Sequence, residues 1–89
     1  MDRHIYIKIT GRVQGVGFRY HTKKIAEKLK ISGFVRNNYD GSVIIEASGE
    51  FDYITQFTNW CYEGPAWSHV ENVEVSENKT RYSGSFSVK

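Results

Sequence analysis

The chain has 89 residues and a mass of 10.3 kDa, enough for one core, so we expect a single domain over residues 1–89. Its hydrophobic content of 39% and net charge of +2 argue against long-range disorder. The sequence has no apolar run of roughly 18 residues, no signal-peptide pattern and a single cysteine, Cys61, which together favour a cytoplasmic protein without a disulfide. One cysteine and three scattered histidines offer no zinc-ligand spacing, so we expect no metal.

The small net charge conceals an uneven distribution. Nine of the 12 Lys and Arg residues lie within residues 1–36, whereas eight of the 10 acidic residues lie within residues 37–89. Residues 3–26 contain no acid at all. Such asymmetry suggests an anionic partner for the basic half, although a solvated helix face would explain much of the same charge.

The first predicted elements are a strand, a glycine-rich loop and a helix. Isoleucines alternate with other residues over 5–9, which is strand periodicity. A loop with three glycines follows over residues 11–17, and apolar residues then recur at helical spacing from Phe18 to Leu29. We expect Ser32-Gly33 to end this helix.

The second half predicts a hairpin, a second helix and two short strands. The remaining elements are a strand from 34 to 36, a turn at Asp40-Gly41, a strand at 43–47, a helix at 51–61 ended by Gly64-Pro65, and strands at 73–75 and 86–88. We expect Phe51, Phe57, Trp60 and Phe86 to lie in the core and Cys61 to be buried and inert. This order predicts an α+β, ferredoxin-like βαββαβ sandwich, an antiparallel sheet with two helices on one face and a short C-terminal strand.

The glycine-rich loop is a candidate anion site. Glycines allow positive φ angles and close approach of a ligand to the backbone, and the helix that follows adds the positive end of its dipole. Arg19, at the start of that helix, can bind two oxygens of one phosphate with its planar guanidinium. A plain strand-to-helix turn with an exposed Arg19 explains the same residues, and the loop alone leaves both interpretations open.

Asn37 is a second candidate, at the end of the second strand. The first two strands of a βαβ unit run parallel, so the glycine loop and Asn37 should meet at one edge of the sheet. An amide can donate to and accept from one water molecule at the same time. Asn37 could instead be a turn residue before Asp40-Gly41. For Asn38 we adopt this interpretation.

Two runs of residues resemble the signatures of the acylphosphatase family. The first is Gly11-x-Val13-Gln14-Gly15-Val16-x-Phe18-Arg19, and the second is Gly33-Phe34-Val35-Arg36-Asn37 with Gly41, Val43 and Gly49. The segments Trp60–Pro65 and Val70–Val73 are also similar to the family, whereas Ala66-Trp67-Ser68 is the least typical part. The likeness extends over essentially the whole chain and points to a small free-standing acylphosphatase.

The resemblance implies a cofactor-free, metal-independent hydrolase that splits the carboxyl-phosphate bond of acyl phosphates into a carboxylate and inorganic phosphate. It assigns phosphate binding to Arg19 and water positioning to Asn37, and selects Asn37 over Asn38. The phosphate would lie on the loop formed by Val13, Gln14, Gly15, Val16, Gly17 and Phe18. The implied partners are a small acyl phosphate and, as competing anions, inorganic phosphate or sulfate; we expect a monomer that binds neither nucleic acid nor membranes.

Three alternatives remain. RNA-binding modules share the βαββαβ order, but residues 42–48 contain no aromatic side chain on which a base could stack. A regulatory domain could keep the anion pocket without turnover. The chain could also be one domain of a larger carbamoyl-phosphate-processing protein.

Overall fold

Alternating isoleucines make β1 (Asp2–Arg12) a strand with one buried face, on which Ile5, Ile7 and Ile9 are fully buried. The structure is a computed structural model that describes residues 1–89. The other elements are α1 (Phe18–Lys28), β2 (Ser32–Asn37), β3 (Val43–Glu50), α2 (Phe51–Glu63), β4 (His69–Glu77) and β5 (Phe86–Val88). No helix has the length and apolar character needed to cross a membrane.

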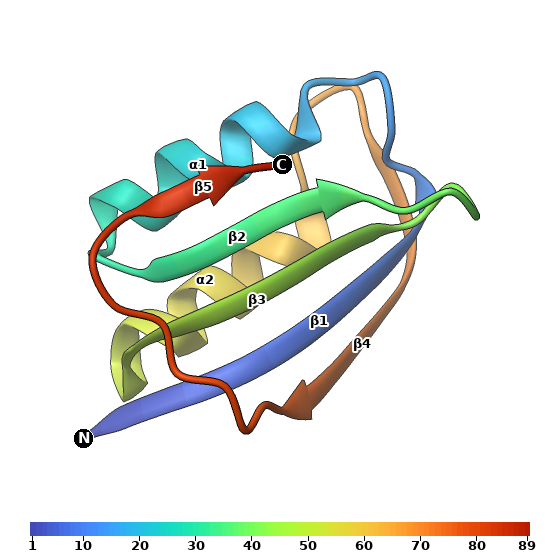
Figure 1. The fold of residues 1–89 in the computed structure, drawn as a ribbon. Helices are drawn as coiled ribbons and strands as arrows, with labels where there is room; N and C mark the ends of the chain where they lie inside the picture. Colours follow the sequence, from blue (N-terminus) through green and yellow to red (C-terminus); the bar gives the residue numbers. More distant parts are fainter.

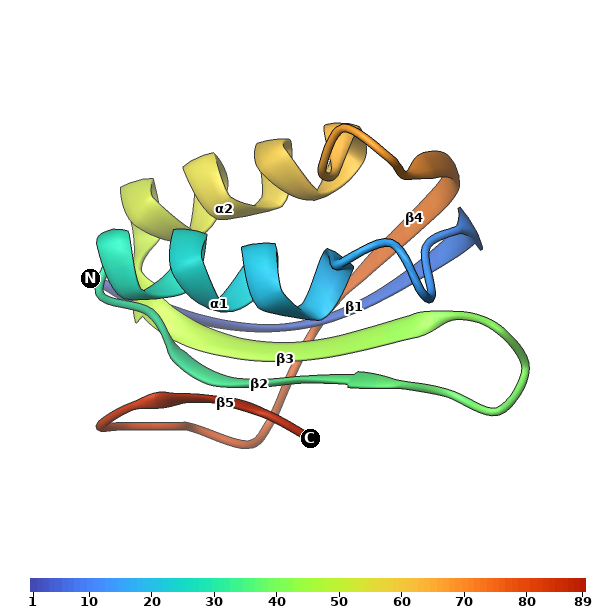
Figure 2. The same cartoon turned by 90° about the horizontal axis from the view of Figure 1, so that it is seen from above.

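The five strands form one sheet in the order β4-β1-β3-β2-β5, and both helices cover the same face of it (Figures 1 and 2). The predicted ferredoxin-like sandwich is therefore confirmed. One detail differs, because β5 pairs with β2 in parallel whereas every other pair is antiparallel. The chain between β4 and β5 crosses the face of the sheet opposite the helices, so it reaches the far edge running in the same direction as β2 (Figure 1).

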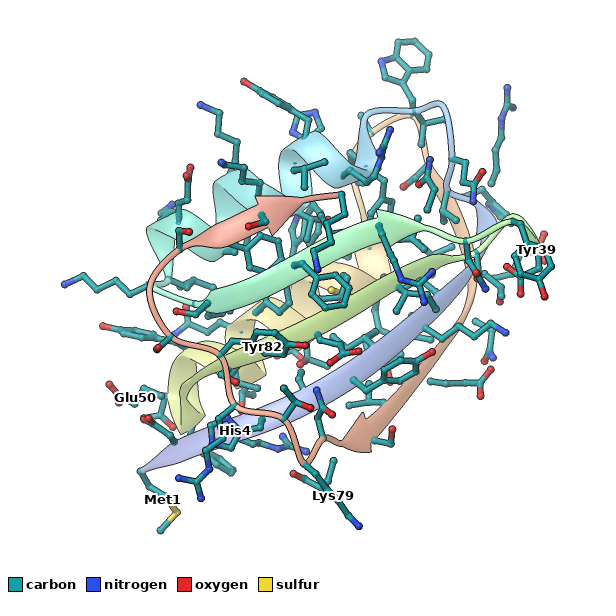
Figure 3. The ribbon with its side chains drawn as sticks, viewed as in Figure 1. Met1, His4, Tyr39, Glu50, Lys79 and Tyr82 are labelled. Atoms are coloured by element: carbon teal, nitrogen blue, oxygen red, sulfur yellow. The ribbon has the colours of Figure 1, made fainter.

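The crossing segment is attached to β3 by polar contacts. Tyr82 donates its hydroxyl to Glu46 at 2.7 Å, and its main-chain N–H donates to the Ser48 hydroxyl at 2.9 Å. His4 lies 2.7 Å from the same hydroxyl through Nδ1. Both His4 and Tyr82 are labelled in Figure 3. Partial burial and the Glu46 hydrogen bond raise the pKa of Tyr82 to about 12.

The core lies between the sheet and the helices and contains 15 buried apolar residues. Phe57 and Phe86 belong to it as predicted, and Trp60 is partly buried against it. Phe51 contradicts the prediction because it is 47% exposed. As the first residue of α2 it lies at the rim of the helix layer, where the guanidinium of Arg3 lies 5.7 Å from its ring. Cys61 is fully buried, and burial raises the pKa of its thiol.

The end of α1 also differs from the prediction. The helix ends at Lys28, and Lys30 adopts a left-handed φ of 57°. The Ile31 N–H then reaches back to the Ala26 carbonyl at 2.8 Å, and the Lys30 N–H to that of Glu27 at 3.2 Å, a pattern that closes a helix without glycine. Ser32-Gly33 instead opens β2, where a Cβ on Gly33 would collide with the carbonyl of Glu46.

The sheet topology fixes where the two candidate segments meet. Strands β1 and β2 both pair antiparallel with β3, which lies between them, so they run in the same direction. The loop after β1 and the last residue of β2, Asn37, therefore lie at the same edge of the sheet.

Candidate active site

The loop between β1 and α1 is shaped by two glycines. Gly15 and Gly17 have φ angles of 72° and 78°, in the left-handed region that other residues adopt at a cost. Gly17 is also the N-cap of α1, which has no side-chain cap and no acidic residue in its first turn. The first N–H groups of the helix therefore remain available, at the positive end of its dipole, to an anion in front of the loop.

A pocket of about 280 Å³ opens in front of this loop. We call it the Arg19 pocket. It is lined by Val13, Gly15, Gly17, Phe18, Arg19, Tyr20, Asn37 and Val88. The structure thus brings Arg19 and Asn37 to one cavity with four of the six predicted loop residues. Gln14 and Val16 do not line it.

Arg19 is oriented by the other end of the chain. Its Nη1 donates to the main-chain oxygen of Lys89 at 2.9 Å, immediately after β5. No acidic side chain pairs with it, and a guanidinium carries five N–H donors, so most of its donors remain free. Because 70 residues separate the partners, no local sequence signal could have revealed this contact.

Asn37 has an unusual environment. Its side-chain oxygen, Oδ1, is the one buried side-chain polar atom in the chain that lacks a hydrogen-bond partner. A buried carbonyl left without a partner costs about 1–3 kcal/mol. Buried polar groups normally have a partner, and an exception calls for an explanation, such as a water or ligand at a functional site. Asn38, by contrast, accepts a hydrogen bond from Arg36 at 3.2 Å and sits in the turn, as predicted.

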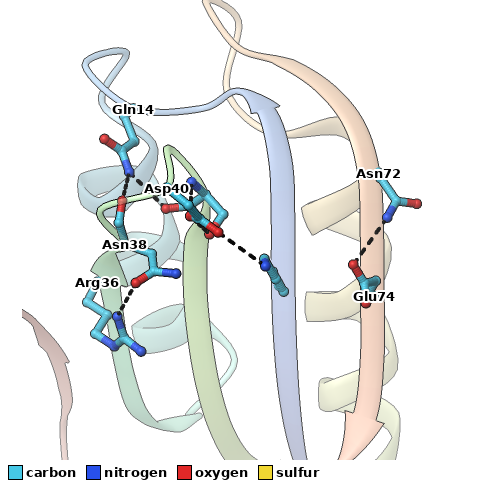
Figure 4. Close-up of polar contacts among 8 residues, drawn as sticks. Gln14, Arg36, Asn38, Asp40, Asn72 and Glu74 are labelled. Atoms are coloured by element: carbon cyan, nitrogen blue, oxygen red, sulfur yellow. Dashed lines mark hydrogen bonds and ion pairs between the residues drawn. The ribbon is translucent and has the colours of Figure 1, made fainter.

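Gln14 ties the glycine loop to the turn that follows Asn37. Its Nε2 donates to the carbonyl of Asn38 at 2.7 Å and to that of Ser42 at 2.9 Å (Figure 4). The predicted residue Gln14 therefore turns its side chain away from the Arg19 pocket and acts as a brace between two segments.

The same turn is stabilised by a carboxylate. Asp40 accepts hydrogen bonds from the N–H and the hydroxyl of Ser42, and it pairs with Lys8 of β1 at 3.2 Å. The Ser42 hydrogen bonds, together with Lys8, hold the pKa of the Asp40 carboxyl well below its usual range. Its hydrogen bond and charge raise the pKa of Lys8 in return.

The sequence did not identify two residues that line the pocket, Tyr20 and Val88, or the Lys89 oxygen that contacts Arg19. Tyr20 follows Arg19 directly, and its position in the first turn of α1 was the available signal. Val88 reaches the pocket, and the Lys89 oxygen reaches Arg19, only because β5 lies beside β2, a pairing that the pattern of residues 86–88 does not specify. Val16 lines a second hollow beside the loop together with Trp67.

Comparisons with known proteins show the family of the chain. The family model described as acylphosphatase matches residues 5–88. An acylphosphatase of Nocardioides sp. is 40% identical over all of this chain and 90% of its own length, and one of Oceanobacillus iheyensis is 47% identical over 84% of each chain.

Solved structures give the same result. An acylphosphatase from Coxiella burnetii superposes with a TM-score of 0.94 at 38% identity, covering 99% of this chain and 93% of the other. Full-length HypF, crystallised in a phosphate- and nucleotide-bound form, contains a similar region with a TM-score of 0.92 at 32% identity, covering all of this chain and 12% of HypF. The chain belongs to the acylphosphatase family, whose members are hydrolases that act on acyl phosphates.

Proposed function

We propose that Arg19 and the main-chain N–H groups of residues 13–18 hold the phosphoryl group of an acyl phosphate, and that Asn37 holds the attacking water. The observation that carries this proposal is that Asn37, whose buried Oδ1 has no hydrogen-bond partner, lines the same pocket as Arg19. An Asn at the end of a strand would normally satisfy its side chain in the turn, as Asn38 does. Asn37 also lines that pocket, where its side-chain amide can hold a water.

The proposed phosphate site supplies positive charge without a metal ion. The free donors of Arg19 and the uncapped start of α1 face the pocket, and no acidic residue lines it. A preorganised set of N–H donors can stabilise the charge that develops on the phosphoryl oxygens. HypF, which contains a similar region, was crystallised with phosphate, which supports our expectation that inorganic phosphate or sulfate competes with the substrate.

The leaving group needs no acid catalyst. The departing carboxylate resembles an Asp or Glu side chain, whose pKa is about 4, so it leaves as an anion at neutral pH. The water would attack in line with the departing oxygen, and an oxygen of the phosphate itself would take the water proton. In that case the pH–rate profile contains no limb that disappears on mutation of a single carboxyl. A limb abolished by Asp40→Asn, or by replacing any other acid, would refute this proton route.

Two substitutions separate the proposed roles. Arg19→Ala should lower kcat by at least 10²–10³-fold, the usual effect of losing one preorganised donor, and should raise the inhibition constant of inorganic phosphate. Arg19→Lys should also fail, because an ammonium cannot form the two parallel hydrogen bonds of a guanidinium. Asn37→Ala should lower kcat but leave phosphate inhibition nearly unchanged. Normal turnover of benzoyl phosphate by the Asn37→Ala protein would remove Asn37 from the mechanism.

We further propose a cytoplasmic monomer that acts on small molecules alone, without nucleic acid or membranes, and that residues 1–89 work as a single domain. The lone cysteine, Cys61, is buried in the core. The exposed aromatic residues are spread over several segments, with Tyr20 on α1, Tyr39 in a turn, Trp67 before β4 and three others on α2. Scattered aromatic residues of this kind are normal on monomer surfaces. Light scattering coupled to gel filtration would give a mass near 10.3 kDa for a monomer.

A further inference from the structure

A second hollow lies beside the loop and meets the Arg19 pocket at Gly15. It is a shallow groove of about 540 Å³ lined by Arg12, Gly15, Val16 and Trp67, here called the Trp67 groove. Gly15 is the one residue that lines both hollows. The groove contains neither Arg19 nor Asn37, so the chemistry of the phosphoryl group does not explain it.

The walls of the Trp67 groove are held in place by the fold. Trp67 lies in a short turn closed by the N–H and the hydroxyl of Ser68, which both bond to the Pro65 carbonyl, at 3.0 and 2.7 Å. Gly64, just before this turn, packs so closely against Phe18 that a Cβ there would lie 2.8 Å from the Phe18 ring. The turn is therefore held against the first residue of α1.

Arg12 reaches the same place from β1. It pairs with His69 across the β1–β4 ladder, two residues beyond Trp67, after a register shift between Thr10 and Gly11. Arg12 is exposed and forms no side-chain hydrogen bond or ion pair. Trp67 is 82% exposed. Trp67, Val16 and an arginine without a side-chain partner thus line one open groove.

In-line displacement determines which side of the phosphorus the acyl group occupies. The attacking water and the departing oxygen lie on opposite sides, so the acyl group must extend away from Asn37. The Trp67 groove begins at the loop that holds the phosphoryl group and does not include Asn37. It therefore offers the acyl group a path away from the water.

We propose that the Trp67 groove is the acyl subsite of this enzyme, in which Trp67 and Val16 contact the apolar body of the acyl group and Arg12 selects acyl groups that carry a distal carboxylate. The inference rests on the proposed phosphate site. A planar aromatic acyl group gains the most, because it can stack on the indole. A carboxylate at its far end meets a guanidinium that has no other partner.

Three substrates test the proposal: acetyl phosphate, benzoyl phosphate and 4-carboxybenzoyl phosphate. Acetyl phosphate is too small to fill the groove. The rigid ring of 4-carboxybenzoyl phosphate prevents its carboxylate from attacking its own acyl carbon. Trp67→Ala should reduce the kcat/KM ratio of benzoyl to acetyl phosphate about tenfold. Arg12→Gln should reduce the ratio of 4-carboxybenzoyl to benzoyl phosphate about threefold, as expected for a partly exposed charge pair. Tyr62→Ala, an exposed aromatic on α2 that lines neither hollow, is the matched control and should change neither ratio.

Phosphate inhibition distinguishes the subsite from the phosphate site. The inhibition constant of inorganic phosphate should stay the same in Trp67→Ala and Arg12→Gln, because phosphate lacks an acyl group. A benzoyl-to-acetyl ratio within twofold of the parent value in Trp67→Ala would overturn the subsite. A drop of the benzoyl-to-acetyl ratio in Tyr20→Ala but not in Trp67→Ala would also overturn the subsite, because it would place the acyl group on the Tyr20 wall of the Arg19 pocket. If the parent protein hydrolyses none of the three substrates, the proposed function itself fails.

Discussion

Replacing Asn37 with alanine should lower turnover without lowering stability, and this combination separates a functional side chain from a structural one. The Asn37 side chain forms no hydrogen bond within the chain, and its Oδ1 is buried without a partner. Truncation therefore removes no stabilising contact and deletes an atom whose burial costs about 1–3 kcal/mol. The backbone pairing of Asn37 with Val43 is unaffected by the side chain.

The expected result is a free energy of unfolding that is unchanged or up to about 1–3 kcal/mol higher in Asn37→Ala, with kcat reduced about 10²–10³-fold. For a domain of this size, each 1 kcal/mol raises Tm by about 4–8 °C. Urea denaturation followed by circular dichroism measures the first quantity, and hydrolysis of benzoyl phosphate measures the second.

The neighbouring residue provides a matched control. Asn38→Ala removes a hydrogen bond from Arg36 at 3.2 Å, so it should lower the free energy of unfolding by about 0.5–1.5 kcal/mol while turnover stays close to that of the parent protein. The reasoning is refuted if Asn37→Ala destabilises the protein by about 1 kcal/mol or more and retains activity, as Asn38→Ala should. Asn37 would then be a turn residue like its neighbour.

Three further predictions concern contacts that stabilise the fold. Gln14→Met keeps the size of the side chain but loses both hydrogen bonds of the brace, so the free energy of unfolding measured in urea should fall by about 2 kcal/mol. An unchanged free energy of unfolding would mean that the brace contributes nothing to stability. Tyr82 keeps its proton to about pH 12 in the folded state but loses it near pH 10 when unfolded. The free energy of unfolding should therefore decline between pH 10 and 12, and Tyr82→Phe should flatten this decline in alkaline denaturation curves. Gly33→Ala would drive a Cβ into the carbonyl of Glu46 at a φ of 138°, so it should cost about 3 kcal/mol or more, and a native-like melting curve would contradict the close approach of β2 and β3.

Local patterns predicted the architecture because each of them operates over a few residues. The isoleucine alternation of residues 5–9 and the helical spacing from Phe18 set the element order, and element order limits this chain to few topologies. The shared sheet edge of the glycine loop and Asn37 followed from the βαβ rule and is confirmed. Phe51 was misjudged because helical spacing identifies a face of the helix, whereas exposure at a helix end depends on what lies beyond it.

The amino-acid sequence alone thus determined the element order, the glycine loop, the placement of Arg19 and Asn37 at one sheet edge, and the likeness to acylphosphatases. Contacts between residues far apart in the chain came only from the folded structure: the Lys89 oxygen on Arg19, the Gln14 brace, the parallel pairing of β5 and the approach of Trp67 to Arg12. Such contacts depend on how the strands are ordered and registered and on where a crossing segment passes, and no short pattern of residues encodes these. Sequence therefore indicated most of the residues that line the proposed phosphate site, while tertiary packing decided how they are held and where the proposed acyl subsite lies.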